Sequence, residues 1–161
     1  MTVPEYNHSV EEYADRLYRF VLKNIKEEST AQDIIQDTFE KLWIKHETVN
    51  YSKVRSYLFT TAYHTLIDYT RKSKKLIEIE DMHNSLSESE NGYFDLKKNL
   101  NGALEKIPEM HRAVILLRDY EGYSYEEIAE ITGLTESQVK VYIYRGRVAL
   151  RKLIGSPEVL L

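Results

Sequence analysis

The sequence predicts an all-α protein built from two small helical domains, and three observations support this prediction. Only six glycines and three prolines occur in 161 residues, so few residues interrupt helices. Apolar residues recur at spacings of three and four along most of the chain, which is the period of an amphipathic helix. The one long stretch without that period is polar and acidic and lies near the middle of the chain.

Three helices are predicted in the N-terminal half. The first covers about 9–27. The second opens where Thr30 and Asp33 match a capping box, and its apolar stripe from Ile34 to Trp43 is predicted to be buried. The third covers about 54–72. These helices are assigned to an N-terminal domain of residues 1–76.

Residues 77–95 are predicted to form a flexible linker. The segment 77–100 carries six acidic and two basic side chains, a balance of −4 that equals the net charge of the whole chain. Serine, glutamate, asparagine and glycine dominate the start of this segment, and such a composition is typical of solvated connecting chain. The two flanking domains are therefore nearly neutral.

The remaining residues, 96–161, are predicted to form a second helical domain. Pro108 ends its first helix and Gly122 ends its second. Ser124 with Glu127, and Thr135 with Gln138, match capping boxes that open a short helix and a last, longer one.

The last two helices have the spacing of a helix-turn-helix. Ala129 provides a small residue where the helices cross, Gly133 suits the turn, and Val139 faces back toward the first helix. On the last helix, the residues predicted to point outward are Glu136, Ser137, Lys140, Val141, Tyr144 and Arg145. A helix of this kind fits the major groove of DNA, and the acid-free basic run after it favours phosphate contacts. The competing interpretation is a capped helical hairpin with a solvated basic face.

The third helix is rich in aromatic residues. Tyr57, Phe59, Tyr63 and Tyr69 lie between Arg55 and a basic cluster at 71–75. Aromatic rings next to cations suit unpaired bases. Taken singly, however, each of these rings is better explained as part of the core.

Several classes of function are excluded by composition. The chain has no cysteine, and its five histidines show no metal-binding spacing, so neither a metal nor another cofactor is expected. No constellation of catalytic residues stands out, and the chain is not expected to be an enzyme. It has no signal peptide and no apolar run long enough to insert into a membrane, so a cytoplasmic protein is expected.

Three blocks of sequence together resemble a sigma factor of the extracytoplasmic-function group, a two-domain bacterial initiation subunit. The block AQDIIQDTFEKLW is similar to the family's polymerase-binding helix, and YLFTTAYHTLIDYTRK to its promoter-melting helix. The segment 107–153 is similar to its upstream-element domain along its whole length. Two positions depart from the family pattern, because His64 stands where asparagine is frequent and Gly146 where alanine is usual. The glycine is expected to let the last helix bend or pack more closely.

The resemblance implies roles for particular residues. It implies contacts with core RNA polymerase by the second helix, contacts with the melted downstream element by the third helix, and contacts with the upstream element by the last helix. The residues concerned are, in that order, Asp33, Gln36, Asp37, Glu40 and Trp43; Arg55, Tyr57, Tyr63, His64, Asp68, Arg71 and Lys72; and Ser137, Lys140, Val141, Tyr144, Arg145 and Arg147.

The partners implied by the resemblance are core RNA polymerase, promoter DNA and an anti-sigma protein, with a monomer expected away from polymerase. Two alternatives remain at this point. One is a stand-alone transcriptional regulator with the same helix-turn-helix, and the other is a helical scaffold without a DNA role. The acidic second helix distinguishes the first alternative, because a regulator has no need of a polymerase-binding helix. The basic last helix argues against the second.

Overall fold

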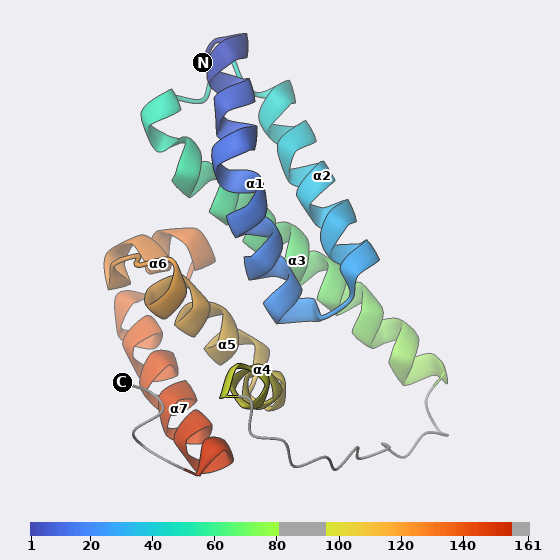
Figure 1. Cartoon of the computed structure of the whole chain (residues 1–161), viewed down its shortest axis with the longest axis vertical. Coiled ribbons are helices and arrows are strands. Elements are labelled where there is room, and N and C mark those ends of the chain that lie inside the picture. Colours follow the sequence, from blue (N-terminus) through green and yellow to red (C-terminus); the bar gives the residue numbers. More distant parts are fainter. Residues whose placement is uncertain (81–95, 156–161) are drawn as a thin grey trace.

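The computed structural model describes residues 1–80 and 96–155, and within these ranges the regular secondary structure is entirely helical. The N-terminal domain contains α1, α2, a short 3-10 turn η1 and α3, and the C-terminal domain contains the remaining elements (Figure 1). The elements are α1 (Val3–Ile25), α2 (Glu28–Ile44), η1 (Tyr51–Lys53), α3 (Val54–Glu80), α4 (Leu96–Lys106), α5 (Glu109–Ile115), η2 (Leu116–Tyr120), α6 (Tyr125–Thr132) and α7 (Glu136–Ile154).

Helices α1, α2 and α3 pack against one another around a single apolar core. Leu17, Leu42, Leu58 and Leu66 are fully buried, and one or more of them comes from each helix. Burial of each such side chain stabilises the fold by roughly 1.5–3 kcal/mol. The three-helix domain predicted from the apolar spacing is therefore present.

The boundaries of these helices differ from the sequence prediction. Helix α1 begins at Val3 rather than near residue 9, because Thr2 and Glu5 form a capping box there. The predicted capping box at Thr30 is wrong. Helix α2 begins at Glu28, and Thr30 lies inside it, 4% exposed, with its hydroxyl 3.2 Å from the hydroxyl of Tyr69.

Helix α3 continues through residues 77–80, which the sequence assigned to the linker. The rest of the predicted linker, residues 81–95, lies outside the described residues, as does the end of the chain after residue 155. The helix of α3 therefore continues beyond the residues whose apolar spacing predicted it, which ended near residue 72.

The C-terminal domain contains the predicted helix-turn-helix. Both capping boxes are present, with Ser124 accepting from Glu127 N at the start of α6 and Thr135 accepting from Gln138 N at the start of α7. Gly133 ends α6 with a φ of 78°, a value that favours glycine. The predicted second helix of this domain is split, because its last turn, η2, is a π-helix.

Glycine 146 lies where α7 crosses α5. A side chain there would overlap Ile115 Cδ1 and would stand 3.3 Å from His111 Cβ. Of the two effects expected for this glycine, the structure shows the closer packing. The same face of α7 also contains Val139, Ile143 and Leu150, which are buried as predicted.

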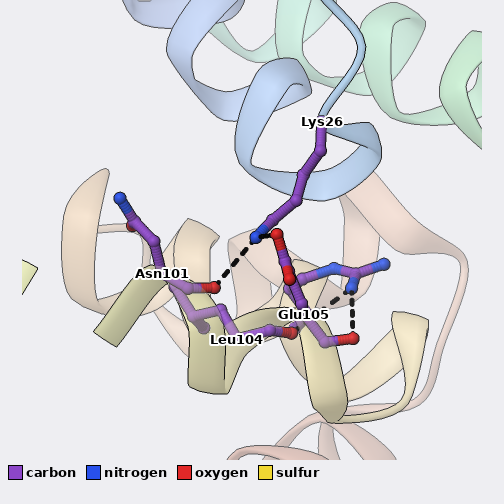
Figure 2. Close-up of polar contacts among 5 residues, drawn as sticks. Lys26, Asn101, Leu104 and Glu105 are labelled. Atoms are coloured by element: carbon purple, nitrogen blue, oxygen red, sulfur yellow. Dashed lines mark hydrogen bonds and ion pairs between the residues drawn. The ribbon is translucent and has the colours of Figure 1, made fainter. Parts of the chain in front are cut away.

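The two domains lie against each other, with α1 and α3 facing α4, α5 and α6 (Figure 1). One edge of this contact is polar: Lys26, at the end of α1, forms an ion pair with Glu105 and donates to the backbone oxygen of Asn101 at 3.1 Å (Figure 2). Lys74 on α3 pairs with Glu109 on α5 at 3.6 Å. These contacts link helices that are far apart in sequence.

Candidate polymerase and nucleic-acid interfaces

The outer face of α2 is acidic and accessible. Asp33, Gln36 and Glu40 are exposed, and Asp37 is half-buried, with one carboxylate oxygen 3.0 Å from Lys41 Nζ. The four residues follow helical spacing, so they share one side of α2 while Ile34 and Leu42 fill the core on the other. This face could dock on a basic surface.

Trp43 extends the same surface toward the end of α2. The structure leaves 44% of it exposed, so the prediction that the buried stripe reaches Trp43 is wrong. Its indole meets the edge of Tyr6 at 5.0 Å and stacks on His46 at 4.5 Å. A large aromatic side chain held rigidly at the surface is a common anchor in protein interfaces.

An open pocket of about 480 Å³ lies between α2 and α3. Tyr57, His64 and Asp68, three residues expected at the downstream element, contribute to its wall. Lys41 and Lys45 add positive charge from α2, and Lys41 also donates to Thr65 Oγ1 at 3.1 Å. An aromatic ring, hydrogen-bonding groups and cations in one hollow suit an unpaired nucleotide.

Sequence reasoning missed part of this pocket. Its further lining residues are Ile44, Thr60, Thr61 and Thr65. The threonines share a helical side with His64 and Asp68, a periodicity that was visible in the sequence. The contribution of α2 was not visible, because it depends on how the two helices cross.

Arg55 and Tyr63 lie on a different side of α3, the side that faces the C-terminal domain. Arg55 Nη2 donates to the backbone oxygen of Glu121 at 2.5 Å. Tyr63 is 2% exposed, and its hydroxyl donates to Met110 Sδ at 3.2 Å. Burial raises the pKa of Tyr63 to about 12. In this arrangement neither residue shares the pocket of Tyr57 and His64, whereas Arg71 and Lys72 are exposed farther along α3.

Helix α7 presents an exposed row of predicted DNA-binding residues. The exposed members are Ser137, Lys140, Val141, Tyr144 and Arg145. Tyr144 is 70% exposed, and Lys140 lies within 3.6 Å of Glu136 on the same face. The capping box at Thr135 fixes the start of the helix, so the row begins in the first turn, where recognition helices contact base edges.

Arg147 differs from the other predicted DNA contacts on α7. It forms a two-pronged ion pair with Asp119 of η2, with nitrogen–oxygen distances of 2.6 and 3.3 Å. The hydrogen bonds to Asp119 raise the pKa of the Arg147 guanidinium. This pair braces α7 against η2 within the domain.

Other kinds of site find no support in the described part of the chain. Residues 1–80 and 96–155 contain no group of three or more histidine, aspartate or glutamate side chains that could hold a metal ion. None of the helices described is both long enough and apolar enough to cross a membrane.

Comparison with models of known protein families assigns the chain to a family. Residues 9–76 match the model for Sigma-70 region 2, and residues 97–150 match the model for Sigma-70, region 4. These two segments correspond to the three-helix domain and the helix-turn-helix domain. The chain belongs to the sigma-70 family.

Comparison with individual relatives identifies the group within this family to which the chain belongs. The chain is 30% identical over 146 residues to the ECF RNA polymerase sigma factor SigM of Bacillus subtilis, covering 88% of this chain and 90% of SigM. It is 31% identical over 144 residues to the sigma factor SigV of the same organism, covering 88% and 86%. The chain is an extracytoplasmic-function sigma factor, which directs promoter-specific transcription initiation, and a stand-alone regulator is not favoured. Sigma factors act by binding rather than by catalysis.

The fold is also shared with a solved structure. The sigma factor RpoE from Bartonella quintana, solved in complex with the anti-sigma factor NepR, superposes with a TM-score of 0.81 at 24% identity. The match covers 96% of this chain and 99% of that one. The fold, including the presence of both domains, is therefore that of known sigma factors.

Proposed function

We propose that this sigma factor divides promoter-specific initiation among three surfaces. The acidic face of α2, with Trp43, binds core RNA polymerase. The pocket between α2 and α3, with the exposed residues Arg71 and Lys72, binds the melted downstream element. The exposed row on α7 reads the upstream element.

The observation that carries this proposal is the two-sided character of α7. One side is buried through Val139, Ile143 and Leu150, and the opposite side leaves Tyr144 and Arg145 free. A capped helix anchored in this way can enter a major groove without disturbing its own domain. A solvated hairpin would have no need of an aromatic residue that is 70% exposed in the middle of this row.

The acidic α2 face supports the polymerase contact on electrostatic grounds. Complementary charge increases the rate of association and fixes orientation more than it adds affinity. Trp43 supplies apolar contact area beside the charges. Because the partner is core RNA polymerase, we place the activity in the cytoplasm.

An anti-sigma protein is the regulatory partner that we propose. The sigma factor RpoE, which shares this fold, was solved with the anti-sigma factor NepR. CnrH, which matches with a TM-score of 0.68 at 21% identity, was also solved with a partner, the cytosolic domain of CnrY. A groove of about 460 Å³ between α1 and α4 offers a place for a partner helix, with Leu22 and Leu104 in its wall and Lys26 at one edge. A candidate partner should abolish initiation by reconstituted holoenzyme when it is added before polymerase.

The test of the proposed function is a reconstituted start assay with core RNA polymerase and a library of promoter fragments. The wild-type chain should produce starts at a defined two-element promoter. Asp37→Arg should abolish these starts, because it places a positive charge in the middle of the acidic face that is proposed to bind polymerase. The matched control is Glu11→Arg, an equal charge change at an exposed position of α1. Initiation unaffected by Asp37→Arg would contradict the α2 assignment.

A further inference from the structure

A short loop of the C-terminal domain, Glu121–Tyr123, lies against α1 and α3 of the N-terminal domain. We propose that this loop is an internal mimic of a nucleotide. It occupies in the free chain a surface around Arg55 that binds single-stranded promoter DNA in the holoenzyme. This inference rests on the proposed function and extends its downstream-element surface along α3 to Arg55 and Tyr63, two residues for which the family resemblance implies contacts with the melted element.

The carboxylate of Glu121 takes the part of a phosphate. Its side chain is only 9% exposed, and Oε2 lies 3.5 Å from Arg16 Nε and 3.9 Å from Arg55 Nη2. Arg16 comes from α1 and Arg55 from the start of α3, so cations from two helices converge on one anion. Guanidinium groups recognise carboxylates and phosphates through the same geometry.

The ring of Tyr123 takes the part of a base. Tyr123 is 2% exposed, and the Arg55 guanidinium lies 4.5 Å from its ring centroid. Phe59 meets the same ring edge-on at 5.5 Å. Proteins hold unpaired bases between arginine planes and aromatic rings in this manner. Arg55 therefore contacts an anion and a ring at once, as it would on a nucleotide.

Unsatisfied polar atoms indicate that the contact is made to be released. Arg55 Nε and the Tyr123 hydroxyl are buried without a hydrogen-bond partner among the described residues, and Glu121 Oε2 is held by its ion pairs alone. In a permanent interface nearly all buried polar groups are paired. Charge and ring packing hold this loop, and both can be transferred to a nucleic-acid strand.

The consequence is competition for one surface. While the loop is docked, Arg55 is engaged and Tyr63 is covered by Met110. The apparent affinity for single-stranded DNA is then the affinity of the open chain multiplied by the fraction of chains that are open. If about nine-tenths of the chains are closed, opening them should tighten binding about tenfold.

The experiment uses the purified full-length chain and Glu121→Arg, which places a third positive charge beside Arg16 and Arg55. Glu130→Arg is the matched control, because Glu130 is exposed on α6 and the charge change is equal. Zero-length carbodiimide crosslinking reports closure, since it joins Lys26 to Glu105 and Lys74 to Glu109 across the two domains. Fluorescence anisotropy with a labelled, random-sequence single strand of DNA reports binding.

We expect both crosslinks in the wild-type chain and in Glu130→Arg, and a several-fold loss of both in Glu121→Arg. We also expect Glu121→Arg to bind the strand about tenfold more tightly than Glu130→Arg does, and Arg55→Ala to remove that gain. Arg16→Glu combined with Glu121→Arg restores the opposite charges and should restore the crosslinks. This restoration also shows that loss of folding does not explain the single variant.

Two results would overturn the inference: a wild-type chain without the interdomain crosslinks, or equal strand binding by Glu121→Arg and Glu130→Arg. The start assay separates this failure from failure of the proposed function. If Arg55→Ala holoenzyme initiates normally, the assignment of Arg55 to promoter DNA falls, and the inference falls with it. If Arg55→Ala impairs initiation but the crosslinks are absent, only the internal mimic is refuted.

Discussion

Replacement of Gly146 by alanine tests the packing of the upstream-element domain most directly. The new methyl group would enter the crossing of α5 and α7, where it overlaps Ile115 Cδ1 and stands 3.3 Å from His111 Cβ. Favourable carbon–carbon contacts lie near 3.5–4.0 Å. Ile115 is 3% exposed, so its side chain has little room to move aside.

Two opposing effects set the size of the change. Alanine is favoured over glycine within a helix by about 1 kcal/mol. Overpacking a filled core costs typically about 1–3 kcal/mol. We therefore expect Gly146→Ala to lower the free energy of unfolding by about 1 kcal/mol, which corresponds to a decrease in Tm of about 2–4 °C for a chain of this size.

Thermal and urea unfolding followed by far-UV circular dichroism measures this change, and a double-mutant cycle assigns its cause. Ile115→Val removes the atom that the new methyl group meets. Alone it should cost about 0.5–1.5 kcal/mol. In the Gly146→Ala background it should cost about 1 kcal/mol less, because it relieves the overlap. A Gly146→Ala chain that is more stable than the wild type, with no coupling to Ile115→Val, would refute the reasoning.

Three other substitutions probe the same domain. Thr135→Ala should lower stability by about 1 kcal/mol in urea unfolding, because the hydroxyl accepts from Gln138 N at the start of α7; Thr135→Ser should be nearly neutral, and equal losses would contradict the cap. Burial, together with the nearby Arg145, lowers the pKa of His111 below its usual 6.5. As pH falls, the unfolded chain therefore binds a proton at His111 before the folded chain does, and stability declines below about pH 6.5. His111→Gln should flatten the decline of Tm between about pH 7.5 and 5. Parallel curves of Tm against pH for the wild type and this variant would contradict the expectation. Arg145→Ala should reduce discrimination among upstream elements by about 1–3 kcal/mol in binding assays, whereas Arg151→Ala should weaken all sequences alike; equal discrimination in the two variants would refute the role of Arg145.

Local features were predicted well because their causes lie within a few residues. The capping boxes at Ser124 and Thr135 each join residues three positions apart, and Gly133 adopts its positive φ within a single turn. The buried face of α7 also follows from helical period alone. The placement of these features on one helix-turn-helix could therefore be read from the chain.

Local reasoning failed where a residue had two possible partners. Thr30 has the chemistry of a helix cap, but in the fold its hydroxyl meets Tyr69, which is 39 positions away. Trp43 continues an apolar stripe, yet α2 ends where the core ends, and the indole remains 44% exposed. The helical period identifies a face but not what covers it.

The sequence by itself determined the helical class, the two domains, the recognition helix and the family, because hydrophobic period, caps and motif order are properties of the chain. Only the tertiary structure decided which side of α3 each aromatic residue occupies and how the domains meet. The bond from Arg55 to Glu121 spans 66 positions, and no local pattern encodes it. Such contacts form only when two separately folded surfaces come together, so they depend on shape and charge across the whole molecule rather than on any segment.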